Sequence, residues 1–64
     1  MTIDEEKDDV LYELRQATQR IRQARESRLL NDNESAHLNM HLARERLEDA
    51  CSLLTVEREK AEIS

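Results

Sequence analysis

The sequence predicts an all-α protein, an antiparallel two-helix hairpin of coiled-coil type that oligomerisation or a helical partner completes. The 64 residues contain no Gly and no Pro and are rich in Ala, Leu, Arg, Glu and Gln, which favour helix. Apolar residues recur every seven positions in two stretches, on either side of an Asn-Asp-Asn segment at 31–33. A chain this short rarely builds a stable core alone, and its single Cys excludes an internal disulfide.

The first helix is expected at about residues 3–30. Thr2 is its candidate N-cap, because Glu5 follows at the spacing of a capping box. Six acids fall within residues 1–13 and five arginines within residues 14–30. This order complements the helix dipole, which favours acids at the start of a helix and bases at its end.

The candidate turn is the segment Asn31–Asn33, because Asn and Asp tolerate left-handed backbone and compete for backbone hydrogen bonds. Any of these three residues can cap a second helix, and Asn31 with Glu34 has capping-box spacing. The second helix is expected at about residues 33–60, with a frayed C-terminus. A linker this short makes the two helices antiparallel within one domain, 1–64. One continuous helix is the alternative, because no Gly or Pro enforces a turn.

Each predicted helix carries a row of small residues and a companion row of large ones. Layers that alternate in size let two helices interdigitate, so we interpret these rows as the seam of the hairpin. The predicted seam residues are Val10, Leu14, Ala17, Ile21, Ala24, Ala36, Met40, Ala43, Leu47, Ala50 and Leu54.

The second helix also has a second apolar side. Winding the sequence at about 100° per residue places further aliphatic residues opposite its alanines, with charged residues between them. A hairpin can cover only one of the two sides, which predicts a surface for another chain; scattered exposed leucines are the alternative interpretation. The predicted partner-binding residues are Leu11, Leu38, Leu42, Leu53 and Val56.

No set of residues predicts catalysis, a cofactor or a bound metal. His37 and His41 share a helix face at a spacing that can ligate zinc, but the glutamate of a zinc-protease helix is absent between them. Cys51 is about three turns away along the same helix. We interpret it as a small buried hydrophobe in a reducing compartment. A hairpin offers no pocket of enzyme size.

The charge of −5 is unevenly distributed along the chain. Arg15, Arg22 and Arg25 lie on roughly one side of the first helix, where they suit RNA phosphates, a solvated face or pairs with acids of the second helix. Those acids are Glu34, Glu45 and Glu48. No apolar run is long enough to span a bilayer, and the acidic N-terminus does not resemble a secretory signal.

Residues 46–54, Arg-Leu-Glu-Asp-Ala-Cys-Ser-Leu-Leu, resemble a run in the small helical-hairpin co-chaperones of type III secretion needle subunits, the YscE type. That run is Leu-Glu-x-Ala-x-x-aliphatic-aliphatic in the second helix. Length, acidic N-terminus and a capping residue near Asn33 also fit. The turn lacks Gly, and His37 and Met40 stand where aromatic residues are expected.

This resemblance implies a cytoplasmic, non-enzymatic protein with helical partners. It would pair with a larger helical-repeat chaperone, and the pair would hold a needle subunit to prevent premature polymerisation. Alone, the chain is expected to form a homo-oligomer, with no membrane contact.

Two other functions stay open. The plasmid copy-number RNA-binding hairpin, the Rop type, is similar in length and in its alternating small and large core layers. That similarity implies a dimeric RNA-binding regulator, although the near absence of aromatic residues disfavours nucleic acid. The third is a small inhibitor protein of the phage or plasmid type.

Overall fold

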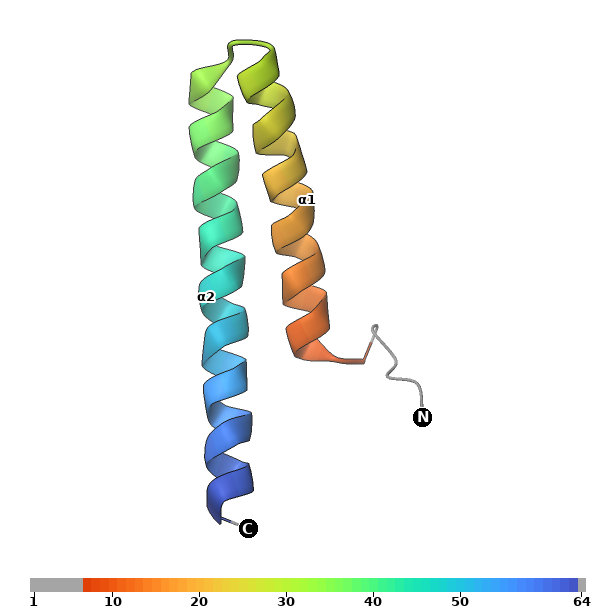
Figure 1. The fold of residues 1–64 in the computed structure, drawn as a ribbon, viewed down its shortest axis with the longest axis vertical. Helices are drawn as coiled ribbons and strands as arrows, with labels where there is room; N and C mark the ends of the chain where they lie inside the picture. Colours follow the sequence, from red (N-terminus) through yellow and green to blue (C-terminus); the bar gives the residue numbers. More distant parts are fainter. Residues whose placement is uncertain (1–6, 64) are drawn as a thin grey trace.

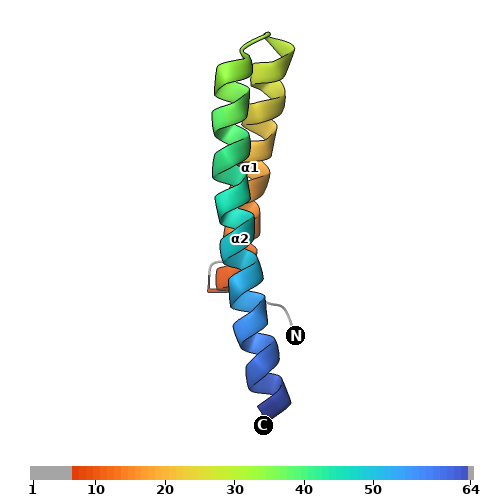
Figure 2. The same ribbon diagram turned by 90° about the vertical axis from the view of Figure 1, so that its left-hand side faces the viewer.

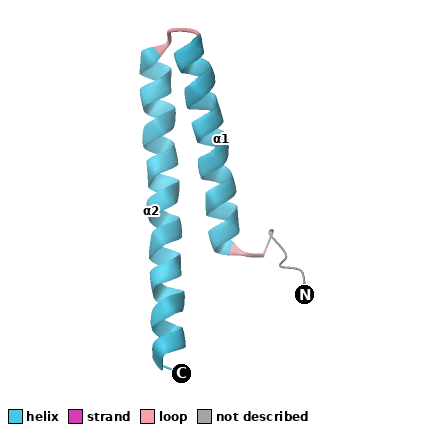
Figure 3. Ribbon diagram, viewed as in Figure 1, coloured by secondary structure: helices cyan, strands magenta, loops and turns pink. Residues whose placement is uncertain are grey.

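Two long helices pack side by side and confirm the predicted all-α hairpin. The computed structural model describes residues 7–63 of the chain. Helix α1 covers Asp9–Leu29 and helix α2 covers Asn33–Ile63 (Figure 1). A short loop joins them, and the described part of the chain contains helix and loop without strands (Figure 3). In the same part, neither helix combines the length and apolarity that crossing a bilayer requires.

Helix α1 begins at Asp9, later than the predicted start near residue 3. Asp8 has extended backbone angles, φ −91° and ψ 109°, and its carboxylate accepts a hydrogen bond of 2.9 Å from the Leu11 amide. A residue with this geometry is an N-cap, so the helix cannot run through it toward the N-terminus. The predicted capping pair Thr2 and Glu5 lies outside the described residues.

Asn31 makes the turn by adopting left-handed backbone, with φ at 61°. Its amide donates to the Arg28 carbonyl at 3.0 Å, and the Asp32 amide donates to the Ser27 carbonyl at 2.8 Å. These two bonds form a Schellman motif, which satisfies the last carbonyls of a helix and ends it. The alternative of one continuous helix is therefore wrong.

Of the three expected cap candidates, Asp32 caps helix α2. Its carboxylate accepts a hydrogen bond of 3.1 Å from the Ser35 amide, and this bond, together with one to the Ser35 side chain, lowers the pKa of Asp32 below its ordinary value. Arg28 donates to the side-chain oxygen of Asn33 at 2.8 Å, which links the end of α1 to the start of α2. Helix α2 then continues to Ile63, past the predicted end near residue 60.

The buried core is a single row of mostly small side chains along the contact between the helices. It consists of Val10, Ala17, Ala24, Ala43 and Ala50. The Cα atoms extend over 50 × 23 × 12 Å, and from the side α1 lies behind α2 (Figure 2). The hairpin is thus one layer of helices with two broad faces.

Candidate interaction surface

The large residues of the predicted seam form an exposed face beside the buried alanines. Each lies four positions after a small residue, and four residues turn a side chain by about 40° round a helix. Because the helices are antiparallel, this rotation brings the large residues of both helices to the same side of the hairpin. We call this set the aliphatic face: Leu14, Ile21, Met40, Leu47 and Leu54, each 38–55% exposed.

The size of the core residues explains why these larger neighbours stay exposed. The distance between two packed helices depends on the side chains at their contact, and alanine allows a close approach. Ala17 and Ala43 are almost fully buried, whereas Ala36, nearer the turn, is half-buried. The structure differs here from the predicted seam, since the small row lies between the helices and the large row lies along its border.

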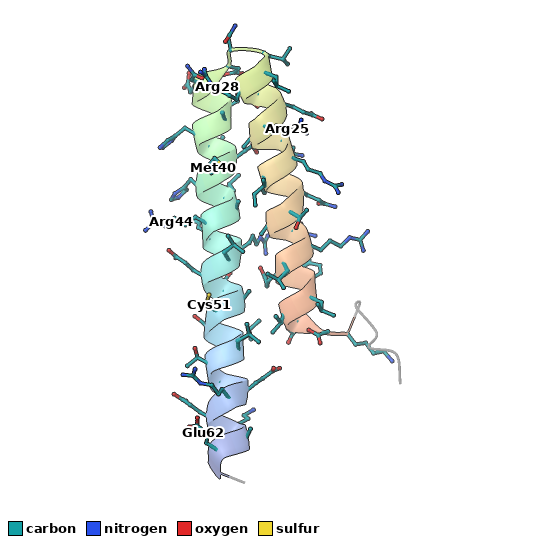
Figure 4. The ribbon with its side chains drawn as sticks, in the orientation of Figure 1. Arg25, Arg28, Met40, Arg44, Cys51 and Glu62 are labelled. Atoms are coloured by element: carbon teal, nitrogen blue, oxygen red, sulfur yellow. The ribbon has the colours of Figure 1, made fainter. Side chains whose placement is uncertain are left out.

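Near the turn the aliphatic face deepens into an apolar groove of about 380 Å³. Ile21 of α1 and Met40 of α2 line it, and the buried Ala24 lines it as well. Arg25 and Arg28, which are labelled in Figure 4, also line this groove. The groove therefore offers an apolar interior with positive charge at its edge.

The opposite border of the seam is polar. Arg46 donates to the Glu13 carboxylate at 3.2 Å, and the Glu13 side chain is only 16% exposed. In this pair the acid belongs to α1 and the arginine to α2. The sequence suggested the opposite, arginines of the first helix paired with acids of the second. No ion pair among residues 7–63 joins Arg15, Arg22 or Arg25 to α2.

The structure does not bring the five predicted partner-binding residues together as one exposed surface. Leu38 and Val56 are 57% and 47% exposed. Leu42 and Leu53 are half-buried. Leu11 is half-buried on the other helix.

The two histidines lie on the surface near the start of α2. The His41 Nε2 atom is 3.1 Å from a carboxylate oxygen of Glu45, one turn later. His37 and His41 line a shallow hollow of about 530 Å³ with Glu34 and Leu38. The described residues contain no cluster of three or more His, Cys, Asp or Glu arranged to hold a metal ion.

Cys51 differs from its interpretation as a buried hydrophobe, because its thiol is free and exposed on α2 (Figure 4). It follows the buried Ala50 by one position, and one residue turns a side chain by about 100° from the seam. The small-residue row therefore ends at the alanines, and the cysteine is part of the surface.

Sequence reasoning assigned the aliphatic face to the interior, although one signal in the sequence indicates its exposure. The rows that touch between the helices consist of alanine in all positions but Val10. Helices in contact through alanine leave no gap that leucine side chains can fill, so the companion row has to point elsewhere.

No protein-family model, no curated protein and no solved structure matches the chain.

Proposed function

We propose that this chain is a non-enzymatic interaction module that binds a helical partner on its aliphatic face. The observation that carries the proposal is the exposure of five large apolar side chains in one row on one side of the hairpin. Full burial of each such side chain contributes roughly 1.5–3 kcal/mol, and each is about half-covered already. A partner helix that covers the row therefore supplies stability that the alanine core lacks.

The narrower proposal is a cytoplasmic co-chaperone of type III secretion. It rests on the resemblance of residues 46–54 to the second helix of the YscE-type hairpins. Two residues of that run, Leu47 and Leu54, belong to the aliphatic face. In this proposal the hairpin stabilises a larger helical-repeat chaperone, and that pair covers the self-associating helix of a needle subunit.

The narrower proposal expects genes for a helical-repeat chaperone and a needle subunit beside this gene. The test compares two charged double variants in binding to the products of such genes. Met40→Asp with Leu47→Asp charges the aliphatic face, and Leu38→Asp with Val56→Asp charges the opposite flank of the same helix. We expect the first variant to lose co-purification with the chaperone and the second to retain it. Circular dichroism checks that both remain helical.

Retention of the complex by the aliphatic-face variant, with loss in the flank variant, would transfer the binding site to the predicted partner-binding residues. Retention by both variants would remove the interaction-module proposal for either side of α2. Absence of any complex with the chaperone or needle subunit would remove the co-chaperone proposal.

An RNA-binding dimer is the second candidate function, and the arginines of α1 favour it. Arg15, Arg22 and Arg25 are exposed and make no ion pair with α2 within the described residues. Phosphate contacts by such side chains give binding that weakens as salt rises. Changing the three arginines to Ala should abolish a gel shift of structured RNA at low salt; a wild-type chain that shifts no RNA there contradicts this candidate.

A further inference from the structure

We propose that a second copy of this chain covers the aliphatic face, with the two turns at opposite ends of a four-helix dimer. In this dimer a two-fold axis crosses the hairpin at the level of Ala17 and Ala43. The inference rests on the proposed function, because it names the occupant of the same surface.

The shape of the hairpin provides the first argument. The chain is one helix thick, 12 Å, with a face of 50 by 23 Å. Stable domains bury their apolar faces between two packed layers, and a single layer cannot do so. A standard interface needs about 800 Å² from each partner, and the rectangle that the Cα atoms span, 50 by 23 Å, is of the same order. Two stacked hairpins therefore supply the missing layer.

The register of the hairpin makes four of the five residues of the aliphatic face self-complementary. Arg46 reaches Glu13, so residues at equal distances from the turn lie side by side. Leu14 is then beside Leu47, and Ile21 is beside Met40. Both helices thus repeat a large residue at spacing seven, and the pairs Leu14/Ile21 and Met40/Leu47 share one midpoint, the level of Ala17 and Ala43. Leu54 lies outside these pairs, seven residues further along α2.

A two-fold axis at that midpoint pairs large residues with large residues. Leu14 lies over Ile21 of the second copy, and Met40 lies over its Leu47. An isologous dimer requires one surface that matches itself after rotation, and Leu14, Ile21, Met40 and Leu47 meet this requirement.

The charges select the arrangement with turns at opposite ends. Arg25 and Arg28 lie in the half of the hairpin nearer the turn, and Glu62 lies near the far end of α2 (Figure 4). Arg44 follows Ala43 and lies at the level of the axis, so both arrangements hold Arg44 of the two copies at one level and it does not discriminate between them. Glu57 and Glu59 also lie on that last part of α2. Turns at the same end would bring Arg25 and Arg28 of both copies to one level, whereas turns at opposite ends place Arg28 within about one helical turn, along the helix axis, of Glu57 of the second copy.

The first experiment is sedimentation of the full chain from micromolar to millimolar concentration. We expect a particle of twice the 7.6 kDa chain mass. Met40→Asp with Leu47→Asp should sediment as a monomer, and Leu38→Asp with Val56→Asp should remain a dimer. A wild-type monomer over the whole range would overturn the inference, and a dimer in both variants would show that another surface mediates it.

The second experiment measures the distance between spin labels on Cys51, the only cysteine. Cys51 is eight residues from Ala43, or about 12 Å along the axis, so the two labels should be separated by about 24 Å in that direction. A dimer with turns at the same end places both labels at one level. A distance distribution that matches the second geometry would overturn the proposed arrangement.

A second label site tests whether the spin label on Cys51 itself changes the dimer. In a Cys51→Ser background, Glu57→Cys moves the label to fourteen residues from Ala43, and the axial separation should grow to about 42 Å. Sedimentation of each labelled protein checks that it remains dimeric.

The outcomes separate the inference from the proposed function. A monomer that still binds the chaperone through the aliphatic face refutes the second copy and leaves the interaction module standing. A dimer whose mass is unchanged by charging the aliphatic face, in a chain that binds no other partner there, refutes both.

Discussion

Asn31 holds the left-handed backbone on which the hairpin turn depends. An ordinary residue in this conformation suffers a clash between its Cβ atom and the backbone, whereas Asn tolerates it. The turn therefore needs no glycine, and the absence of Gly from the sequence does not argue against a hairpin.

Replacing Asn31 by Val should lower the free energy of unfolding by about 1–2 kcal/mol, because a β-branched residue is strained in left-handed backbone. Urea titration followed by circular dichroism measures the change. Asn31→Gly is the control, since Gly adopts this conformation without a Cβ clash and should retain or raise stability. Equal stability of the Val and Gly variants would contradict the left-handed turn.

Asp32 makes the start of α2 sensitive to acid. Its hydrogen bond with the Ser35 amide lowers the pKa of the folded form below the ordinary 3.8. The charged cap therefore stabilises the hairpin fully above pH 3.8 and loses its contribution as pH falls through the lower folded pKa.

The matched variant is Asp32→Asn, which caps a helix but does not titrate. Helicity of both proteins should be compared from neutral pH down to pH values below the ordinary pKa of Asp. The wild-type chain should lose more helicity than the variant over the acid part of this range. Parallel curves would show that Asp32 contributes no pH-dependent cap.

At the scale of the helices, the alanine row determines how closely α1 and α2 approach. Ala43 sits in the middle of this row and is almost fully buried. Ala43→Leu should destabilise the hairpin by about 1–3 kcal/mol, because the added side chain forces the helices apart. Thermal unfolding measures the effect, and Thr55→Leu at an exposed position of α2 is the control. An Ala43→Leu variant as stable as this control would refute close packing at the row.

The Glu13–Arg46 pair is the ion pair between the helices within residues 7–63. Exposed pairs contribute about 0.2–1 kcal/mol, and the partial burial of Glu13 favours the upper part of this range. A double-mutant cycle of Glu13→Ala and Arg46→Ala measures the coupling. Salt should weaken it, and strictly additive single variants would show that the pair contributes nothing.

The two helices and the turn between them were largely predictable from the sequence. The all-α hairpin followed from composition, the seven-residue repeats and the Asn-Asp-Asn segment. The start of α1 was not predictable, because Asp8 and Thr2 both suit a cap and the choice depends on tertiary packing. The aliphatic face was missed because a repeat identifies the residues near a seam but not which row the helices have room to enclose.

At the scale of the whole molecule, the chain is a single helical layer whose larger apolar side chains lie outside its core. A core of one valine and four alanines buries little apolar surface, and the burial of apolar surface is the main contribution that favours folding. Stability of the isolated hairpin is therefore expected to be low compared with that of the associated form.

The midpoint of thermal unfolding should consequently rise with protein concentration. Association stabilises the folded state by mass action, so dilution shifts the equilibrium toward the unfolded chain. Circular dichroism melts over a hundredfold or so range of concentration measure this dependence. The Met40→Asp and Leu47→Asp double variant should melt at a lower temperature that is independent of concentration. A constant midpoint for the wild-type chain would argue against a folded state that needs association.

Helix α2, at 31 residues, is longer than the 21-residue α1, and it runs on past the first residue of α1 (Figure 1). Isolated helices shorter than about 12–15 residues are marginal in water. The part of α2 that projects past α1 is therefore expected to be only weakly stable as a helix. Its amide protons should therefore exchange with solvent faster than those near the turn. Slower amide exchange in this part of α2 after a binding molecule is added would show that the molecule contacts it.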